Sequence, residues 1–136
     1  MLGRKLRLFL WAQTELVFGW VLVRMAPFRW VARQLGHSGA VAGPPLDADA
    51  VRVAEVAWAI AAVSRRTPIP YTCLMQAVAA QRMLRRRRIP STAYLAMAAD
   101  TSNGRSLAAH AWVRCGTRVV VGACDESRFR VIARFA

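Results

Sequence analysis

Apolar and polar positions follow a helical period through the first half of the chain. Residues 6–30 are dominated by apolar side chains, and only a few polar residues such as Gln13 and Glu15 interrupt them. This pattern predicts a buried or amphipathic helix. Pro27 is expected to kink this helix or to begin a second short helix that ends near Leu35.

A loop and two further helices are expected next. Glycine and proline dominate residues 36–46 and predict a loop. Asp47 or Asp49 is expected to cap a helix that runs to about residue 65. Prolines in the stretch 67–70 end that helix, because the residue before a proline is disfavoured in the α region.

Thr72 is the predicted N-cap of the following helix, which begins with Cys73 and ends near Arg88. After Pro90 the period changes from helical to alternating, which is typical of strands. Strands are predicted at 91–98, 107–114, 118–121 and 129–132, with turns at 100–104 and 115–117. Helices followed by an antiparallel sheet indicate an α+β fold.

Length and composition allow a single domain over 1–136, with a helical part at 1–65 and the rest of the core at 66–136. The hydrophobic fraction of 56% leaves apolar surface for a partner, and the net charge of +13 favours acidic ones. An arginine-rich composition also arises from a GC-rich genome. No nucleic-acid partner is expected, because helix-turn-helix, stacking-aromatic and phosphate-loop motifs are missing from the sequence.

Three cysteines, Cys73, Cys115 and Cys124, show neither disulfide-framework nor zinc-ligand spacing. No metal or cofactor is therefore expected, and a reducing cytoplasm is the predicted location. The uncharged stretch 16–23 is shorter than the roughly 18 residues that a spanning helix needs. Core packing is predicted for the N-terminal helix, although its tryptophans and arginines would also suit peripheral contact with a membrane.

One cysteine and one histidine have the spacing of a catalytic pair. Cys73 lies where a proline-marked extended stretch becomes a helix, and a helix N-terminus favours a thiolate. His110 lies 37 residues later in the middle of a predicted strand. An imidazole held close to the thiol would accept its proton and later protonate a leaving amine. A buried structural role for Cys73 is the alternative.

The order of several short motifs resembles the transglutaminase-like cysteine peptidases, and more narrowly the lasso-peptide maturation proteases, which remove the leader from a lasso precursor. The matching pieces are Arg66-Thr67-Pro68, Cys73-Leu74-x-Gln76-Ala77, Leu84–Pro90, His110-Ala111-Trp112-Val113, Val121-Gly122 and Arg128-Phe129. The resemblance implies a papain- or transglutaminase-like fold, with Cys73 as nucleophile and His110 as general base and acid.

The family's third catalytic residue is an aspartate on the strand that pairs with the histidine strand. A hairpin centred near Cys115 is expected to put Val121 or Gly122 opposite His110, and neither carries a carboxylate. Asp125 is therefore the candidate that orients the imidazole, and a solvated loop charge is its other interpretation. A backbone carbonyl would fix the ring tautomer if Asp125 does not.

The resemblance further implies the stand-alone form of the protease. Its expected partners are a precursor peptide with its leader, a separate leader-recognition protein and a lasso cyclase. Two other functions stay open: a transglutaminase-like acyltransferase or amidase that uses the same pair, and a non-enzymatic basic adaptor.

Overall fold

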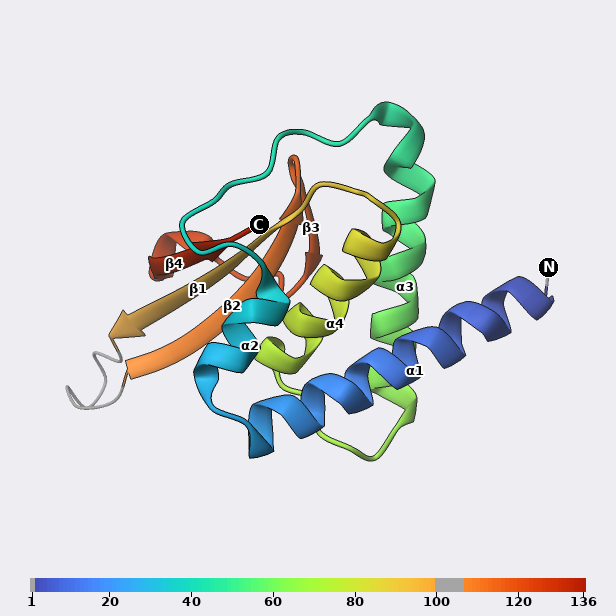
Figure 1. Ribbon diagram of the computed structural model, residues 1–136, viewed down its shortest axis with the longest axis horizontal. Coiled ribbons are helices and arrows are strands. Elements are labelled where there is room, and N and C mark those ends of the chain that lie inside the picture. The colour runs from blue at the N-terminus through green and yellow to red at the C-terminus, as the bar shows by residue number, and fades with distance from the viewer. Residues whose placement is uncertain (1, 100–106) are drawn as a thin grey trace.

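The computed structural model describes residues 2–99 and 107–136, in which four α-helices precede a four-stranded antiparallel sheet (Figure 1). This order confirms the α+β class predicted from the sequence. The elements are α1 (Leu2–Met25), α2 (Phe28–Leu35), α3 (Ala50–Arg66), α4 (Cys73–Arg86), β1 (Thr92–Ala99), β2 (Leu107–Cys115), β3 (Arg118–Val121) and β4 (Arg130–Phe135), with short 3₁₀ turns at Asp47–Asp49 and Glu126–Arg128.

Local sequence signals account for the helix ends. Pro27 separates α1 from α2, as its fixed φ and missing N–H predict. The hydroxyl of Thr72 accepts a hydrogen bond from the N–H of Met75, so the predicted cap of α4 is confirmed. The helix ends at residue 86 rather than near Arg88, because Arg88 adopts a left-handed conformation with φ 57°.

The sheet has the strand order β3-β2-β1-β4. β1 and β2 pair in one unbroken register from Thr92↔Arg114 to Ala99↔Leu107, and the predicted turn at 100–104 lies outside the described residues. β4 runs to Phe135, beyond its predicted end, because it pairs with β1 along most of that strand. Both β1 and β2 are therefore central strands.

The register of β3 corrects one expectation. Val121 lies opposite Val113, not opposite His110, and the register shifts between Val113 and Arg114. The chain turns at Gly116, and the register shift leaves one extra residue, Val120, in β3. Together they displace β3 along β2 relative to the predicted pairing. β3 consequently ends before it reaches the level of His110.

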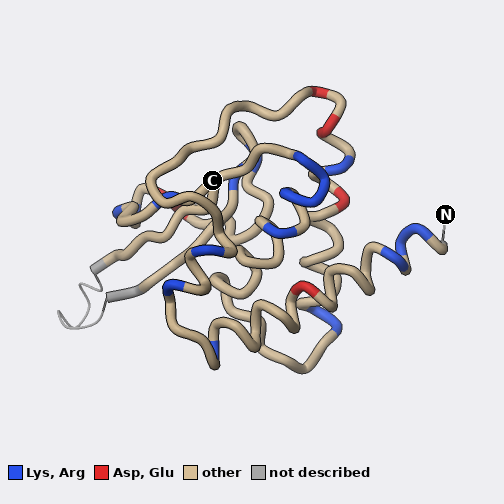
Figure 2. The backbone as a smooth tube through the Cα atoms, in the orientation of Figure 1, with Lys and Arg blue, Asp and Glu red and all other residues tan. Residues whose placement is uncertain are grey.

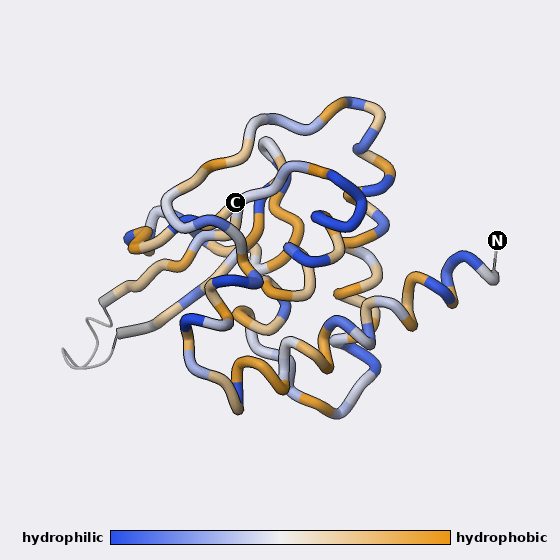
Figure 3. Tube along the Cα trace, viewed as in Figure 1, coloured by the Kyte–Doolittle hydropathy of each residue, from blue (hydrophilic) through white to orange (hydrophobic). Residues whose placement is uncertain are grey.

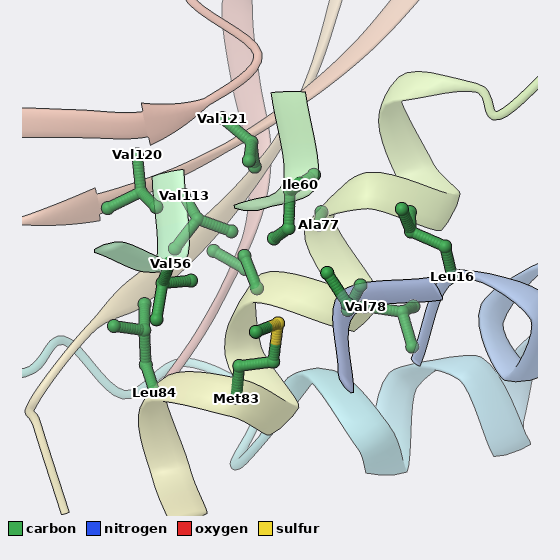
Figure 4. Packing of buried hydrophobic residues seen from close by; sticks show 14 of the residues in the cluster. Leu16, Val56, Ile60, Ala77, Val78, Met83, Leu84, Val113, Val120 and Val121 are labelled. Carbon is green, nitrogen blue, oxygen red and sulfur yellow. The ribbon is translucent and has the colours of Figure 1, made fainter. Parts of the chain in front are cut away.

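The hydrophobic core lies between the helices and one face of the sheet (Figures 1 and 4). α3, the helix predicted to run to about residue 65, forms part of it, since Val56 and Ile60 are fully buried. Val113 and Val121 face these helices from the sheet. Burial of this kind supplies most of the stability of a small domain.

Acidic residues tie the helices to the arginine-rich end of α4. Buried Glu15 of α1 forms an ion pair with Arg82 at 2.5 Å. Glu55 of α3 pairs with Arg87 at 3.0 Å and with Arg4 at 2.7 Å. Some arginines at the end of α4 are therefore paired with acids of the same chain, and these ion pairs hold α1, α3 and α4 together.

By length and composition alone, α1 is apolar enough to cross a membrane. Its most apolar window has a mean hydropathy of 1.4, and 33% of that window is buried in the fold. The same helix contributes Leu8, Ala12 and Leu16 to the core, as a packed helix of a globular domain does. The predicted packing of α1 against the core is thus confirmed, although one of its faces is left uncovered.

Candidate active site

Cys73 is the first residue of α4, and its thiol is half-buried. The extended segment before it ends at Thr72, whose hydroxyl satisfies the N–H of Met75. The N–H groups of Cys73 and Leu74 have no hydrogen-bond partner among the described residues. Free N–H groups at a helix start attract negative charge, so this position suits the oxyanion of an acyl intermediate.

His110 lies in the middle of β2, in a cluster of aromatic rings. Ala111 and Val113 face the helical core, so by strand alternation His110 and Trp112 belong to the other face of the sheet. The imidazole centroid is 5.3 Å from that of Phe129 and 6.1 Å from that of Trp112. Trp112 therefore lies beside the imidazole ring of His110.

A backbone carbonyl orients the imidazole. Nε2 of His110 lies 2.7 Å from the carbonyl oxygen of Gly122. Because a carbonyl only accepts hydrogen bonds, Nε2 carries the proton that is donated to it. In the neutral ring the lone pair is then on Nδ1, and Nδ1 is the atom able to take a proton from a thiol.

The backbone at Gly122 requires glycine. Its φ is +79°, a value that residues with a Cβ rarely adopt. A Cβ at this position would also collide with the carbonyl oxygen of Ala111 and would lie 2.9 Å from Cα of Trp112. The conformation that presents the carbonyl to His110 is therefore open only to glycine.

Cys73 and His110 border one pocket of about 250 Å³. It lies at the start of α4, beside the part of β2 that extends past the end of β3. Apolar side chains make up most of its wall, namely Phe28, Leu74, Leu95, Met97 and Ile132. No hydrogen bond joins Cys73 to His110 in the described part of the chain. Strand alternation places the imidazole on the face of the sheet away from α4, so it has to turn toward Cys73 before a proton can pass between them.

The structure corrects the role predicted for Asp125. Its carboxylate is exposed and accepts hydrogen bonds from the N–H and the hydroxyl of Ser127 at the start of a 3₁₀ turn. These bonds hold the pKa of Asp125 below its ordinary value. No hydrogen bond or ion pair joins this carboxylate to His110 among residues 2–99 and 107–136. The carbonyl of Gly122, which was the fallback expectation, takes the orienting position instead.

The other two cysteines occupy different surroundings. Burial raises the pKa of Cys115 to about 11, so its thiol stays protonated near neutral pH. The pKa of Cys124 is raised by burial and then by the charges of Glu126, Asp125 and Cys73. Cys124 therefore lies within electrostatic reach of Cys73, which the sequence did not indicate. Among the described residues, no group of three or more potential metal ligands is found.

A family model for the transglutaminase-like superfamily matches residues 18–134. The chain belongs to this superfamily. No curated protein and no solved structure matches it significantly. Members of the transglutaminase-like superfamily are typically cysteine-based enzymes, which agrees with a cysteine at a helix start and a histidine on the same pocket. The match supports activity of the cysteine peptidase or acyltransferase type.

The sequence did not identify which backbone carbonyl holds the histidine in this transglutaminase-like chain. Asp125 was the predicted side-chain partner, whereas the group that contacts His110 belongs to the main chain of Gly122. One signal was present in the sequence, because a glycine directly after a valine-rich strand often marks a left-handed residue.

Proposed function

We propose that this chain is a cysteine peptidase that removes the leader from a ribosomally made lasso-peptide precursor. The observation that carries the proposal is the shared pocket of Cys73, at a helix start, and His110, whose tautomer is set by Gly122. The motif order around these residues supports the narrower assignment to lasso-peptide maturation. The superfamily match supports the coarser one.

In the proposed reaction, Nδ1 of His110 takes the proton of Cys73 and the thiolate attacks the amide carbon at the leader–core junction. The N–H groups of Cys73 and Leu74 stabilise the oxyanion that forms. The protonated imidazole then gives its proton to the departing amine. A water molecule, deprotonated by the same ring, hydrolyses the thioester and releases the leader.

The proposed partners follow from this reaction. The freed amino terminus of the core is the nucleophile that a separate cyclase joins to an acidic side chain. A separate leader-recognition protein delivers the precursor, and the reaction takes place in the cytoplasm. The excess of positive charge suits docking to acidic segments of these partners.

An acyltransferase or amidase is the second candidate, because the superfamily match includes acyl transfer. Both share every step up to the thioester: an acyltransferase differs in the acceptor, an amine in place of water, whereas an amidase also uses water and differs in the amide that it cleaves. Mass spectrometry of the product separates the two, since hydrolysis adds the mass of water and transfer adds the mass of the amine. A non-enzymatic basic adaptor would form no thioester at all.

The decisive experiment follows precursor cleavage by mass spectrometry, with and without the recognition protein. Cys73→Ala and His110→Ala are each expected to abolish cleavage, and the double variant to be no slower than either, because members of a catalytic unit are not additive. Cys115→Ser and Cys124→Ser serve as controls that keep activity. Cleavage that persists in Cys73→Ala contradicts the proposal.

A further inference from the structure

The face of α1 that points away from the core is apolar along the helix. Leu6, Leu10, Val17 and Val21 are 56, 53, 37 and 42% exposed. Their spacing of 4, 11 and 15 residues from the first brings them onto one line of the helix surface. Figure 3 shows the apolar positions that recur along this helix. We call these four residues the outer stripe.

The polar residues on the line between Leu10 and Val17, Gln13 and Thr14, are already satisfied. Gln13 donates to the hydroxyl of Tyr71 at 3.2 Å. Thr14 lies between Leu10 and Val17, and its hydroxyl donates to the carbonyl oxygen of Leu10 at 2.9 Å. A threonine bonded in this way satisfies its hydroxyl within its own helix. The outer stripe can therefore leave water without stranding a polar side chain.

Positive charge surrounds the outer stripe, and exposed negative charge is missing from this part of the chain. Residues 1–46 contain six cations and a single acid, Glu15, which is buried against Arg82 (Figure 2). The cations are Lys5, Arg7, Arg24, Arg29, Arg33 and Arg4, of which Arg4 is paired with Glu55 of α3. A surface that covers the outer stripe therefore lies next to cations of α1 and α2. Neither helix places an exposed acidic side chain against it.

Aromatic and apolar side chains extend the surface past the C-terminal end of α1. Met25 is 79% exposed, and Phe28 and Trp30 of α2 are exposed as well. The guanidinium of Arg24 lies 5.7 Å from the ring of Trp20. Tryptophan next to arginine suits the headgroup layer of a bilayer, where apolar and charged surroundings meet.

From these observations we propose that the outer stripe binds the surface of an anionic lipid bilayer, with α1 lying in the plane of the headgroups. An apolar line with cations around it is the pattern of interfacial helices. Spanning the bilayer is ruled out for the folded chain, because Leu8, Ala12 and Leu16 on the opposite face are part of the core.

A bilayer fits the outer stripe better than a protein partner does. A protein groove requires complementary shape, whereas the outer stripe is a straight ridge on a helix whose N-terminal end extends beyond the other elements (Figure 1). The mean hydropathy of 1.4 also suits lipid, and the charge of residues 1–46 complements anionic headgroups.

Membrane binding would bring the pocket close to the bilayer. Phe28, the first residue of α2, lines the same pocket as Cys73. A substrate held at the membrane surface would then need little diffusion to reach the thiol. The proposal itself does not depend on the chemistry at Cys73, so the two are tested separately.

The test is co-sedimentation of the full chain with vesicles of phosphatidylcholine alone and with vesicles that also contain phosphatidylglycerol. Binding is expected only with phosphatidylglycerol and is expected to weaken as salt is added. Arg7→Gln and Arg24→Gln should each weaken it roughly fivefold, the usual effect of one cation near a charged surface.

A matched pair of variants tests the outer stripe itself. Val17→Glu with Val21→Glu should weaken binding at least about tenfold, because two charges would enter the apolar layer. Val41→Glu with Leu46→Glu makes the same change in net charge at exposed apolar positions of a loop. Once the effect of net charge is allowed for, the affinity of this variant for the vesicles should stay within about twofold of that of the native chain. Thermal melts check that all variants are folded.

Three results would overturn the proposal. The first is equal binding by the two double variants, the second is equal binding to both kinds of vesicle, and the third is no binding to either. The last result would assign the outer stripe to a protein partner.

Discussion

Nε2 of His110 and the carbonyl oxygen of Gly122 form a hydrogen bond of 2.7 Å that joins β2 to the segment after β3. A main-chain group thus holds the ring where a carboxylate was expected. The carbonyl is fixed by backbone dihedrals and loses no side-chain entropy when it binds the ring. It is also neutral, so it stabilises an imidazolium less than a carboxylate does.

Replacement of Gly122 by alanine is expected to displace this carbonyl. The Cβ would collide with Ala111, and φ would have to leave the left-handed region. We expect Gly122→Ala to lower turnover at least about tenfold and to destabilise the fold by about 1–3 kcal/mol. A changed pH profile of turnover would show that the histidine, and not only stability, is affected.

Gly39→Ala is the matched control. Gly39 also has a positive φ, +82°, but a Cβ there would meet nothing within 4 Å. This variant should lose about 1 kcal/mol of stability from backbone strain alone and should keep the native pH profile. If both variants change turnover in proportion to stability, Gly122 has no specific role in positioning His110.

Asp125→Asn is expected to be nearly silent in turnover. The carboxylate is exposed and caps a 3₁₀ turn through Ser127, and an asparagine keeps an acceptor oxygen for that purpose. Turnover should change by less than about twofold, as for ordinary surface substitutions. A loss of orders of magnitude would restore Asp125 as the group that orients His110.

Alkylation with iodoacetamide near neutral pH is expected to modify Cys73 first. The raised pKa values of Cys115 and Cys124 keep their thiols protonated, and for Cys115, with a pKa of about 11, the thiolate fraction near pH 7 is roughly 10⁻⁴. Peptide mapping by mass spectrometry identifies the labelled residue. Equal labelling of Cys73 and Cys115 would argue against a special environment at the helix start.

The ion pairs of Glu55 predict a loss of stability in acid. The hydrogen bond from Arg4, followed by the one from Arg87, lowers the pKa of Glu55 in the folded state. Its contribution is therefore complete above the unfolded pKa of about 4.3 and is lost as pH falls through the lower folded value. Because Arg4 is largely exposed, the contribution is no more than about 1 kcal/mol.

Urea unfolding of Glu55→Gln tests this expectation. The variant should be less stable than the native chain near neutral pH, and the difference should shrink at pH values below about 4. Asp47→Asn makes the same charge change at an exposed position and should show little difference at any pH. A Glu55→Gln effect that is independent of pH would point to packing instead of charge.

Sequence patterns predicted the elements well where local chemistry decides them. Thr72 before an apolar helix and Pro27 between two helices mark boundaries that depend on neighbouring residues only. The pairing of β3 was misplaced because a register shift next to Val113 depends on packing between strands. A backbone carbonyl was the alternative partner predicted for His110, but its residue was not identified, since the position of a main-chain carbonyl depends on the folded path at Gly122.

The residues that hold His110 belong to a segment with few anchors. Between the end of β3 and the start of β4, residues 122–129 contact the sheet through the Gly122 carbonyl, the Phe129 ring and an ion pair between Glu126 and Arg114. Local opening of so small a segment costs far less free energy than global unfolding. On heating, the alignment of the histidine should consequently fail while the helices and the four-stranded sheet are still intact, so catalytic competence would have a lower thermal limit than the fold.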